Sequence, residues 1–266
     1  MKYRAIVLDI DGTLIFHERG RPTEACVQAL HALKERGVLV IIATGRGPFI
    51  STPKALAGLQ ADYLVCANGS YVVSRDGQVL HEDRLDAQHL ERLVDFAEAR
   101  GHHLYFTFED AYYLYAKPPT PQQEKPKKDE KKPSFILDGR GVLRHNDGMP
   151  YGAFCLMPRE DTLRYCAAWP GLKMMESQKG AYDICSETSD KAVGVGVLLE
   201  KLGLSWEQVV AVGDGENDIG MLARAGMGVA MGNARDHVKN AANYVTGSVE
   251  ADGVLQVVKQ FFSDDA

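Results

Sequence analysis

The chain has 266 residues, of which 45% are hydrophobic and 25% are charged, and its formal net charge is -6 at pH 7. This composition supports a sizeable apolar core, and the length favours a core domain with a second module. The negative net charge argues against a general nucleic-acid binder, because such proteins need a basic face to neutralise phosphates.

Neither a membrane partner nor export is expected. No apolar stretch approaches the roughly 20 residues of a bilayer-spanning helix. Asp9 and Asp11 interrupt the first apolar run before a secretory core could form. The cysteines lack a CxxC pair, which favours buried thiols in a reducing, cytoplasmic compartment. They are Cys26, Cys66, Cys155, Cys166 and Cys185.

The first part of the chain alternates predicted strands and helices. Short apolar runs that end in polar residues predict buried strands at 4–8, 38–43 and 63–67. A helix is expected between Pro22, at its first position, and Gly37, with a further helix between the second and third strands. This alternation predicts a parallel sheet with right-handed crossovers.

The strict alternation ends near residue 70. A hairpin is predicted at 71–80, followed by a helix at 86–100 and strands at 103–108, 111–116, 152–157 and 181–185. Loss of alternation predicts an inserted α+β domain at 83–185. The predicted fold is therefore α/β, with a Rossmann-like parallel-sheet core formed by residues 1–82 and 186–266.

The segment Lys117–Pro133 lies inside the predicted insertion. It holds six lysines, three acids and five prolines, so it can bury little apolar surface. A solvated loop is expected, with a basic flap that attracts anionic substrate as the alternative.

Alternation returns at Asp190. Helices are predicted at 190–202, from Asn217, near 234–241 and at 252–262, and strands at 208–212, 227–230 and near 243–246.

Several predicted strands end in polar residues, and the carboxyl ends of parallel strands are where active sites gather in such sheets. Lys191 opens a helix that would point to the same place. The strand-end residues are Asp9 with Asp11, Thr44, Asn68, and Asp214 with Asp218.

Two carboxylates one residue apart, just after a buried strand, need a cation to balance them. Mg²⁺ fits best, with carboxylates from Asp9 and Asp214 and a main-chain carbonyl as ligands. A calcium-binding loop would need a flanking helix where this chain has a strand. The remaining alternative is that these acids only cap a turn or a helix.

Four motifs occur in the order typical of the haloacid dehalogenase superfamily, which the chain resembles. They are Asp9-x-Asp11-Gly12-Thr13-Leu14, Thr44-Gly45-Arg46, Lys191, and Gly213-Asp214-Gly215-Glu216-Asn217-Asp218. The run from Asp218 to Ala234 and the pair Asn68-Gly69 are similar to the Cof-type phosphatases, whose large α/β cap is inserted after the third core strand. Ala192 departs from the glycine that often follows the motif lysine.

The resemblance implies a role for each motif residue. Asp9 is the nucleophile that accepts the phosphoryl group, and Asp11 is the acid that protonates the leaving oxygen and then activates water. The implied phosphate contacts are Thr44, Gly45, Lys191 and Asn217. The implied Mg²⁺ ligands are Asp9, Asp11 through its main-chain carbonyl, and Asp214, with Asp218 orienting or supplementing them.

Asn68 and Arg46 are the candidates for contact with the substrate. Arg46 either adds positive charge to the site or pairs with an acid of the core. Taken singly, Thr44 could be a helix cap, Lys191 a surface lysine and Asn68 a turn former.

The leading hypothesis is a magnesium-dependent phosphatase that hydrolyses small phosphorylated metabolites, such as sugar phosphates, through an aspartyl phosphate. A sugar phosphomutase with the same chemistry is the alternative within enzymes. A non-catalytic switch resembling a response-regulator receiver is the alternative outside them, but a receiver has no large insertion. The sequence does not indicate the substrate or the oligomeric state.

Overall fold

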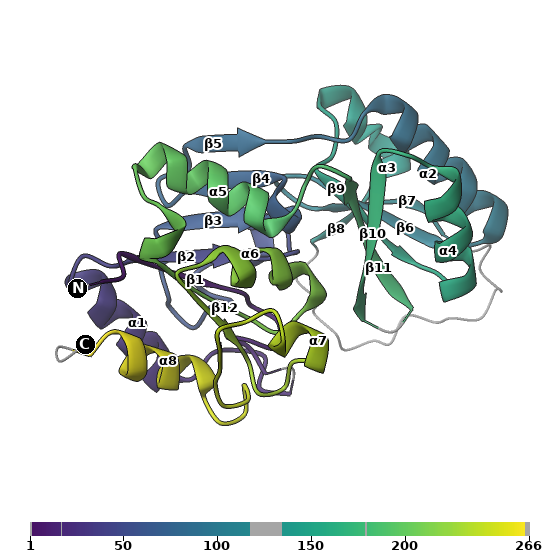
Figure 1. The fold of residues 1–266 in the computed structure, drawn as a ribbon. Coiled ribbons are helices and arrows are strands. Elements are labelled where there is room, and N and C mark those ends of the chain that lie inside the picture. The colour runs from purple at the N-terminus through teal and green to yellow at the C-terminus, as the bar shows by residue number, and fades with distance from the viewer. Residues whose placement is uncertain (1, 17, 118–134, 179, 264–266) are drawn as a thin grey trace. The chain divides into compact units, whose positions relative to one another are not determined.

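The computed structural model describes residues 2–16, 18–117, 135–178 and 180–263. They cluster into two compact units (Figure 1). The core unit comprises Met1–Glu82 and Ser189–Ala266, and the inserted unit comprises Asp83–Thr188. The chain therefore leaves the core unit after Glu82 and returns to it slightly later than the position 185/186 expected from the sequence.

The described residues of the core unit form an eight-stranded sheet with the order β14-β13-β12-β1-β2-β3-β4-β5. Neighbours from β14 to β3 are parallel, whereas β4 and β5 continue the sheet as the antiparallel hairpin predicted at 71–80. The strands are β1 (Ala5–Leu8), β2 (Leu39–Ala43), β3 (Tyr63–Cys66), β4 (Tyr71–Ser74), β5 (Val79–Glu82), β12 (Val209–Gly213), β13 (Met227–Ala230) and β14 (Tyr244–Val245).

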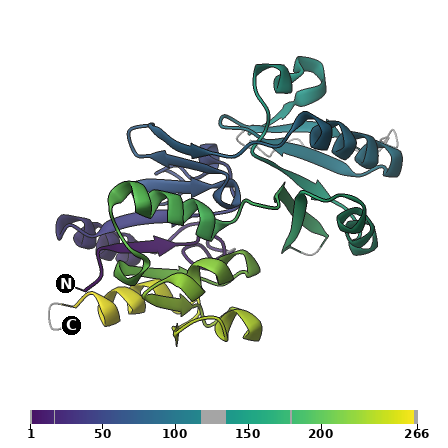
Figure 2. The ribbon, with the colours of Figure 1, turned by 45° about the horizontal axis from the view of Figure 1, so that its top comes forward.

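Helices cover both faces of this sheet (Figures 1 and 2). Strand β1 alternates between the two layers, because Ile6 packs in the same cluster as Leu30 and Val7 packs in the cluster that contains Leu198. No helix in the described ranges is both long and apolar enough to cross a membrane. The helices are α1 (Glu24–Glu35) and α8 (Gly253–Phe261) on one face, and α5 (Lys191–Leu202), α6 (Ile219–Arg224) and α7 (Asp236–Lys239) on the other.

The chain between β2 and β3 corrects one sequence prediction. The helix expected there is absent from the described residues, which show a short 3₁₀ turn, Pro48–Ile50, followed by bends and turns. Pro53 and Gly58 explain this, since both residue types disfavour a helix interior. The polar end of β2 is therefore followed by a loop.

Two helix starts also differ from the sequence predictions. Helix α1 begins at Glu24, with Thr23 as its cap accepting a hydrogen bond from the Cys26 amide, so Pro22 lies outside the helix. The helix expected from Asn217 starts as a 3₁₀ turn, Glu216–Asp218, and becomes α6 only at Ile219.

The described part of the inserted unit has a six-stranded sheet with the order β10-β11-β9-β6-β7-β8, antiparallel except for the β7–β8 pair. Leu93 of α2 and Tyr165 of α4 pack with Phe106 of β6 in one apolar cluster. The elements are α2 (Ala87–Arg100), β6 (His103–Thr107), β7 (Tyr112–Ala116), β8 (Ile136–Asp138), α3 (Gly139–Val142), β9 (Gly152–Leu156), α4 (Arg159–Ala168), β10 (Leu172–Gln178) and β11 (Ala181–Ser186).

Four of these elements, β8, α3, α4 and β10, are missing from the sequence prediction. Strand β8 has only three residues, all of them exposed, and is too short to show an apolar alternation. Except for Lys117, the predicted loop Lys117–Pro133 lies outside the described residues. The predicted α/β class is confirmed.

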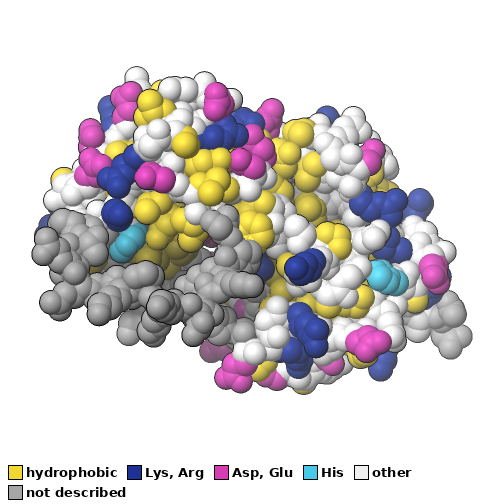
Figure 3. Space-filling view, turned by 180° about the vertical axis from the view of Figure 1, so that it is seen from behind, with side chains coloured by type: hydrophobic (Ala, Val, Ile, Leu, Met, Phe, Trp, Pro, Cys, Tyr) yellow, Lys and Arg dark blue, Asp and Glu magenta, His cyan; other side chains and the backbone are white. Residues whose placement is uncertain are grey.

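Charges of both signs share the molecular surface. Figure 3 shows lysine and arginine side chains interspersed with aspartate and glutamate on the face that it presents. The described surface of that face therefore shows no uniformly basic field of the kind that tracks a phosphate backbone.

The buried cysteines generate a prediction about thiol reactivity. Cys26, Cys66, Cys155 and Cys185 are buried, and burial raises the pKa of the first three to about 12. Because the thiolate is the reactive form, these four residues should resist a maleimide in the native chain and react fully in denaturant. Peptide mass mapping measures this, and rapid native labelling of Cys66 would contradict the packing described.

Candidate active site

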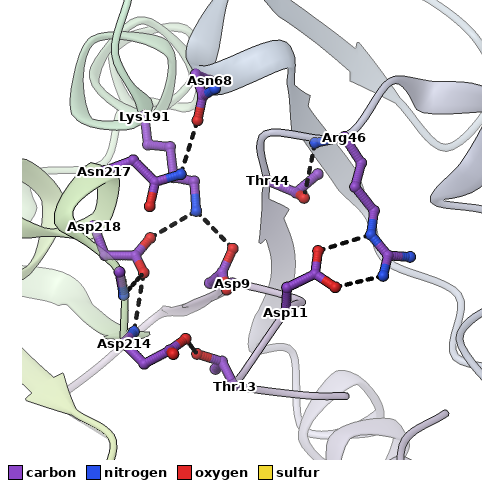
Figure 4. A network of polar contacts seen from close by, with 11 residues as sticks. Asp9, Asp11, Thr13, Thr44, Arg46, Asn68, Lys191, Asp214, Asn217 and Asp218 are labelled. Atoms are coloured by element: carbon purple, nitrogen blue, oxygen red, sulfur yellow. Dashed lines mark hydrogen bonds and ion pairs between the residues drawn. The ribbon is translucent and has the colours of Figure 1, made fainter. Parts of the chain in front are cut away.

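Polar residues from distant parts of the chain meet at the carboxyl edge of the core sheet (Figure 4). Asp9 follows β1, Thr44 follows β2, Asn68 follows β3 and Asp214 follows β12. The parallel pairing of β1 with both β2 and β12 puts these strand ends at one edge. The convergence predicted from the sequence is therefore present in the structure.

Lys191 lies at the centre of this group. It is the first residue of α5, whose cap Asp190 accepts a hydrogen bond from the Val193 amide at 3.0 Å. Its side chain is buried, and its Nζ donates to Asp9 Oδ1 at 2.6 Å and to Asp218 Oδ1 at 2.7 Å. The structure thus excludes the interpretation of Lys191 as a surface lysine.

Asp9, Asp214 and Asp218 form a carboxylate cluster in which each residue offers one oxygen, all within 4.8 Å of one another. Asp9 and Asp218 are buried. Asp218 Oδ2 accepts hydrogen bonds at 2.9 Å from the amides of Asp214 and Gly215, so Asp218 holds both the lysine and the loop after β12.

The electrostatics of the cluster favour an added cation. Burial raises the pKa of Asp9 well above its ordinary value, with Lys191 opposing that rise and the neighbouring acids adding to it. Burial and Asp218 raise the pKa of Asp214 to about 6. For Lys191, burial lowers the pKa, but Asp218 and Asp9 outweigh it and the net shift is upward. An ammonium beside three clustered acids leaves excess negative charge, and oxygen ligands of this kind suit Mg²⁺.

Asp11 points away from the carboxylate cluster in this structure (Figure 4). Its Oδ2 accepts from Arg46 Nε at 2.8 Å, and its Oδ1 accepts from Arg46 Nη2 at 2.5 Å. Of the two possibilities for Arg46, the structure shows pairing with an acid. The carboxylate of Asp11 is not in the metal-competent group found among the described residues, and its predicted ligand atom was the main-chain carbonyl.

The loop Thr44–Arg46 contains an internal hydrogen bond and is also hydrogen-bonded to β3. Thr44 is buried, its amide donates to Val65 O at 2.8 Å, and its Oγ1 accepts from the Arg46 amide at 3.1 Å. The hydroxyl of Thr44 therefore holds a backbone turn rather than capping an α-helix, and Gly45 lies within that turn.

The turn Ala67–Gly69 after β3 is conformationally strained. Ala67 and Asn68 have φ values of 49° and 54°, in the left-handed region that costs a non-glycine residue roughly 1–2 kcal/mol. Gly69 has φ of 98°, and a Cβ there would lie 2.0 Å from Asp190 O, next to Lys191. Asn68 is thus a turn residue, as one sequence interpretation held, and its Oδ1 also accepts from Asn217 Nδ2 at 2.8 Å.

Two residues that orient Asp214 were not singled out from the sequence. Thr13 Oγ1 donates to Asp214 Oδ1 at 3.0 Å. Asn233 Nδ2 donates to Gly12 O at 2.9 Å and to Asp214 Oδ2 at 3.2 Å, while Asn233 Oδ1 accepts from the Val249 amide at 2.9 Å. Thr13 lies in the motif Asp9–Leu14 and Asn233 in the run from Asp218 to Ala234. Their positions in the sequence do not indicate that they contact Asp214.

Comparison with known proteins places the chain among hydrolases. Residues 6–258 match a family model described as haloacid dehalogenase-like hydrolase. The chain is 28% identical to the putative phosphatase YkrA of Bacillus subtilis, with 98% of each chain covered. It is also 28% identical to the pyridoxal phosphate phosphatase YbhA of Escherichia coli, covering 97% of this chain and 98% of that one.

A solved structure is similar over nearly the whole length. It is that of BT1666 from Bacteroides thetaiotaomicron, described among phosphatases of the haloalkanoate (HAD) enzyme superfamily. The TM-score is 0.83 at 25% identity, and the match covers 98% of this chain and 95% of that one.

The carboxylate cluster predicts opposite effects of pH on stability with and without metal. Because the folded-state pKa of Asp214 is raised from 3.8 to about 6, the folded chain binds more protons than the unfolded chain in that window. The free energy of unfolding of the metal-free chain should therefore fall as pH rises through it, by up to about 3 kcal/mol for this group.

Mg²⁺ should reverse that loss, because it binds the ionised carboxylates and its stabilising effect grows as they lose protons. Urea denaturation with chelator and with Mg²⁺, at about pH 5 and about pH 7.5, measures both effects. Equal stability with and without Mg²⁺ at the higher pH would argue against a metal at this cluster.

Proposed function

The chain belongs to the haloacid dehalogenase-like hydrolases and is a phosphatase of small phosphorylated compounds, and from this premise we propose that it works with Mg²⁺ through a phosphoryl group carried on Asp9. The observation that carries the proposal is the carboxylate cluster of Asp9, Asp214 and Asp218 around Lys191. The cluster combines a nucleophile, a cation and ligands for a metal in one buried place.

Asp9 is proposed as the nucleophile because Lys191 fixes its side chain. With Oδ1 held by the ammonium, Oδ2 is the oxygen that attacks phosphorus. The bond from phosphorus to the leaving oxygen breaks, and that oxygen takes a proton to depart as an alcohol. Water then attacks the phosphoryl group, loses a proton, and releases inorganic phosphate and the Asp9 carboxylate.

Asp11 is proposed to deliver the first proton and accept the second. Proton transfer needs hydrogen-bond reach, so the Asp11 side chain must leave Arg46 during the reaction. The side chains of this ion pair are 27% exposed for Arg46 and 61% exposed for Asp11, so its loss should cost about 1 kcal/mol or less. The ion pair with Arg46 is therefore proposed to be the conformation of Asp11 before the reaction begins.

The phosphoryl oxygens are proposed to contact the Thr44 hydroxyl, the Gly45 amide, the Lys191 ammonium and the Asn217 amide. Asp9, Asp214 and the Asp11 main-chain carbonyl, with Asp218 in support, would hold Mg²⁺, which would supply positive charge to those oxygens and favour the ionised form of Asp9.

The proposed substrates are small phosphate monoesters such as sugar phosphates. The name of the pyridoxal phosphate phosphatase of Escherichia coli supports a small substrate. Specificity is proposed to reside in the inserted unit, Asp83–Thr188, because the core unit supplies the groups that act on the phosphate. A screen of phosphorylated metabolites with Mg²⁺, read as inorganic phosphate, tests this.

Asp9→Asn should lower the turnover of an aryl phosphate by about a thousandfold or more, because the amide cannot attack phosphorus. Steady-state kinetics measure the loss, and thermal unfolding verifies the fold. Asp95→Asn, which removes an exposed acid on α2, is the matched control and should behave as the unmodified chain. Retained activity in Asp9→Asn would eliminate Asp9 as the nucleophile.

The fate of the phosphoryl group separates a phosphatase from a phosphomutase. A sugar 1-phosphate incubated with the chain and Mg²⁺ should yield inorganic phosphate, because water is the proposed second acceptor. Phosphorus NMR follows both products in one sample. Accumulation of the sugar 6-phosphate with no inorganic phosphate would show that the substrate itself is the acceptor.

A further inference from the structure

The turn Ala67–Gly69 is held in its strained conformation by contacts on several sides. The amide of Ala67 donates to Arg46 O at 3.0 Å, and the amide of Asn68 donates to Thr44 O at 3.0 Å. The absent side chain of Gly69 leaves room for Asp190 O. Strain that the surroundings over-determine is typical of sites where a side chain must be aimed.

The side chain that this turn aims is that of Asn68. It is 2% exposed, and its Oδ1 accepts a hydrogen bond from Asn217 Nδ2, with 2.8 Å between the two atoms (Figure 4). Asn217 lies 149 positions later in the sequence, in the 3₁₀ turn after β12. Asn217 is partly buried, and a hydrogen bond between two such amides restricts the rotation of both side chains.

The turn that contains Asn217 is also anchored by the next residue, Asp218, whose contacts do not orient the Asn217 side chain. Asp218 holds that turn through two backbone amides and Lys191, but these contacts leave the Asn217 side-chain torsions undetermined. The bond to Asn68 commits one amide hydrogen and so sets where the rest of the amide group points.

We propose that Asn68 is a positioning residue that acts through Asn217, and that the left-handed turn at Ala67–Gly69 serves to aim it. This inference rests on the proposed function, in which Asn217 contacts the phosphoryl oxygens. It assigns Asn68 a role through Asn217, whose Nδ2 donates to Asn68 Oδ1, and not through a direct contact with the substrate. The same turn ties the Thr44–Arg46 loop and the start of α5 to β3, so it aligns phosphate contacts from three segments.

A double-mutant cycle tests the proposal with Asn68→Gly, Asn217→Ala and the double variant. Glycine is chosen at position 68 because it accepts φ of 54° without strain while it removes the side chain that carries the amide. Ala57→Gly is the matched control, since Ala57 is exposed and has the same φ of 54° outside the site. Kinetics with an aryl phosphate and Mg²⁺ give kcat and KM for each variant.

Asn68→Gly should lower kcat by about tenfold with little change in KM, as for other residues that orient a contact group. In the Asn217→Ala background the same change should alter kcat by less than about twofold, because its target is gone. Ala57→Gly should match the unmodified chain. Equal losses in both backgrounds, or no loss in either, would overturn the proposal.

Side-chain NMR keeps this test separate from the test of phosphatase activity. In the ¹⁵N-labelled chain, the Asn217 amide signals should be dispersed and protected from exchange, and should shift toward free-amide positions in Asn68→Gly. An inactive chain that shows this shift would contradict the proposed function and retain the pair. If the Asn217 side-chain signals do not shift in Asn68→Gly, the positioning role is overturned, whatever the activity of the variant.

Discussion

The active-site geometry depends on one buried ammonium placed between carboxylates. Lys191 bridges Asp9, at the end of the first strand, and Asp218, in the turn after β12. Without this contact the two acids would face each other in a poorly solvated place, which is costly for charged groups. The ion pairs therefore join the two segments of the core unit that the insertion separates in the sequence.

Residues without side chains make that approach possible. A Cβ on Gly12 would lie 2.2 Å from Asp214 Oδ2, and a Cβ on Gly213 would lie 2.4 Å from Asp218 Cγ. Thr13 and Asn233 then fix the Asp214 carboxylate in the space left open. The motif glycines thus leave the space in which the carboxylates pack, and the motif acids supply the charge of the same cluster.

The parallel core could be predicted because its strands are short apolar runs that end in polar residues. That pattern locates β1, β2, β3 and β12 and implies that their ends meet. The helix predicted between β2 and β3 is wrong, because Pro53 and Gly58 disfavour a helix interior in that segment. Strand β8 escaped detection because its three residues are too few to show a strand pattern.

The partner of each side chain in the site could not be predicted from the sequence, for a different reason. The Asp11–Arg46 and Asn68–Asn217 contacts join positions that no local period relates, and each depends on backbone conformations fixed by the fold. Composition and spacing identify such residues as polar and close to strand ends. Their partners follow only once the strands are assembled.

The claim that Asp9 carries the phosphoryl group is tested most directly by trapping it there. In an Asp11→Asn variant, loss of the proposed base should slow attack by water, so an activated aryl phosphate should leave the phosphoryl group on the chain. After acid quench, peptide mass mapping should find one phosphoryl group on the peptide that contains Asp9. A phosphoryl group on another residue, or continued release of inorganic phosphate without any modified peptide, would contradict the account.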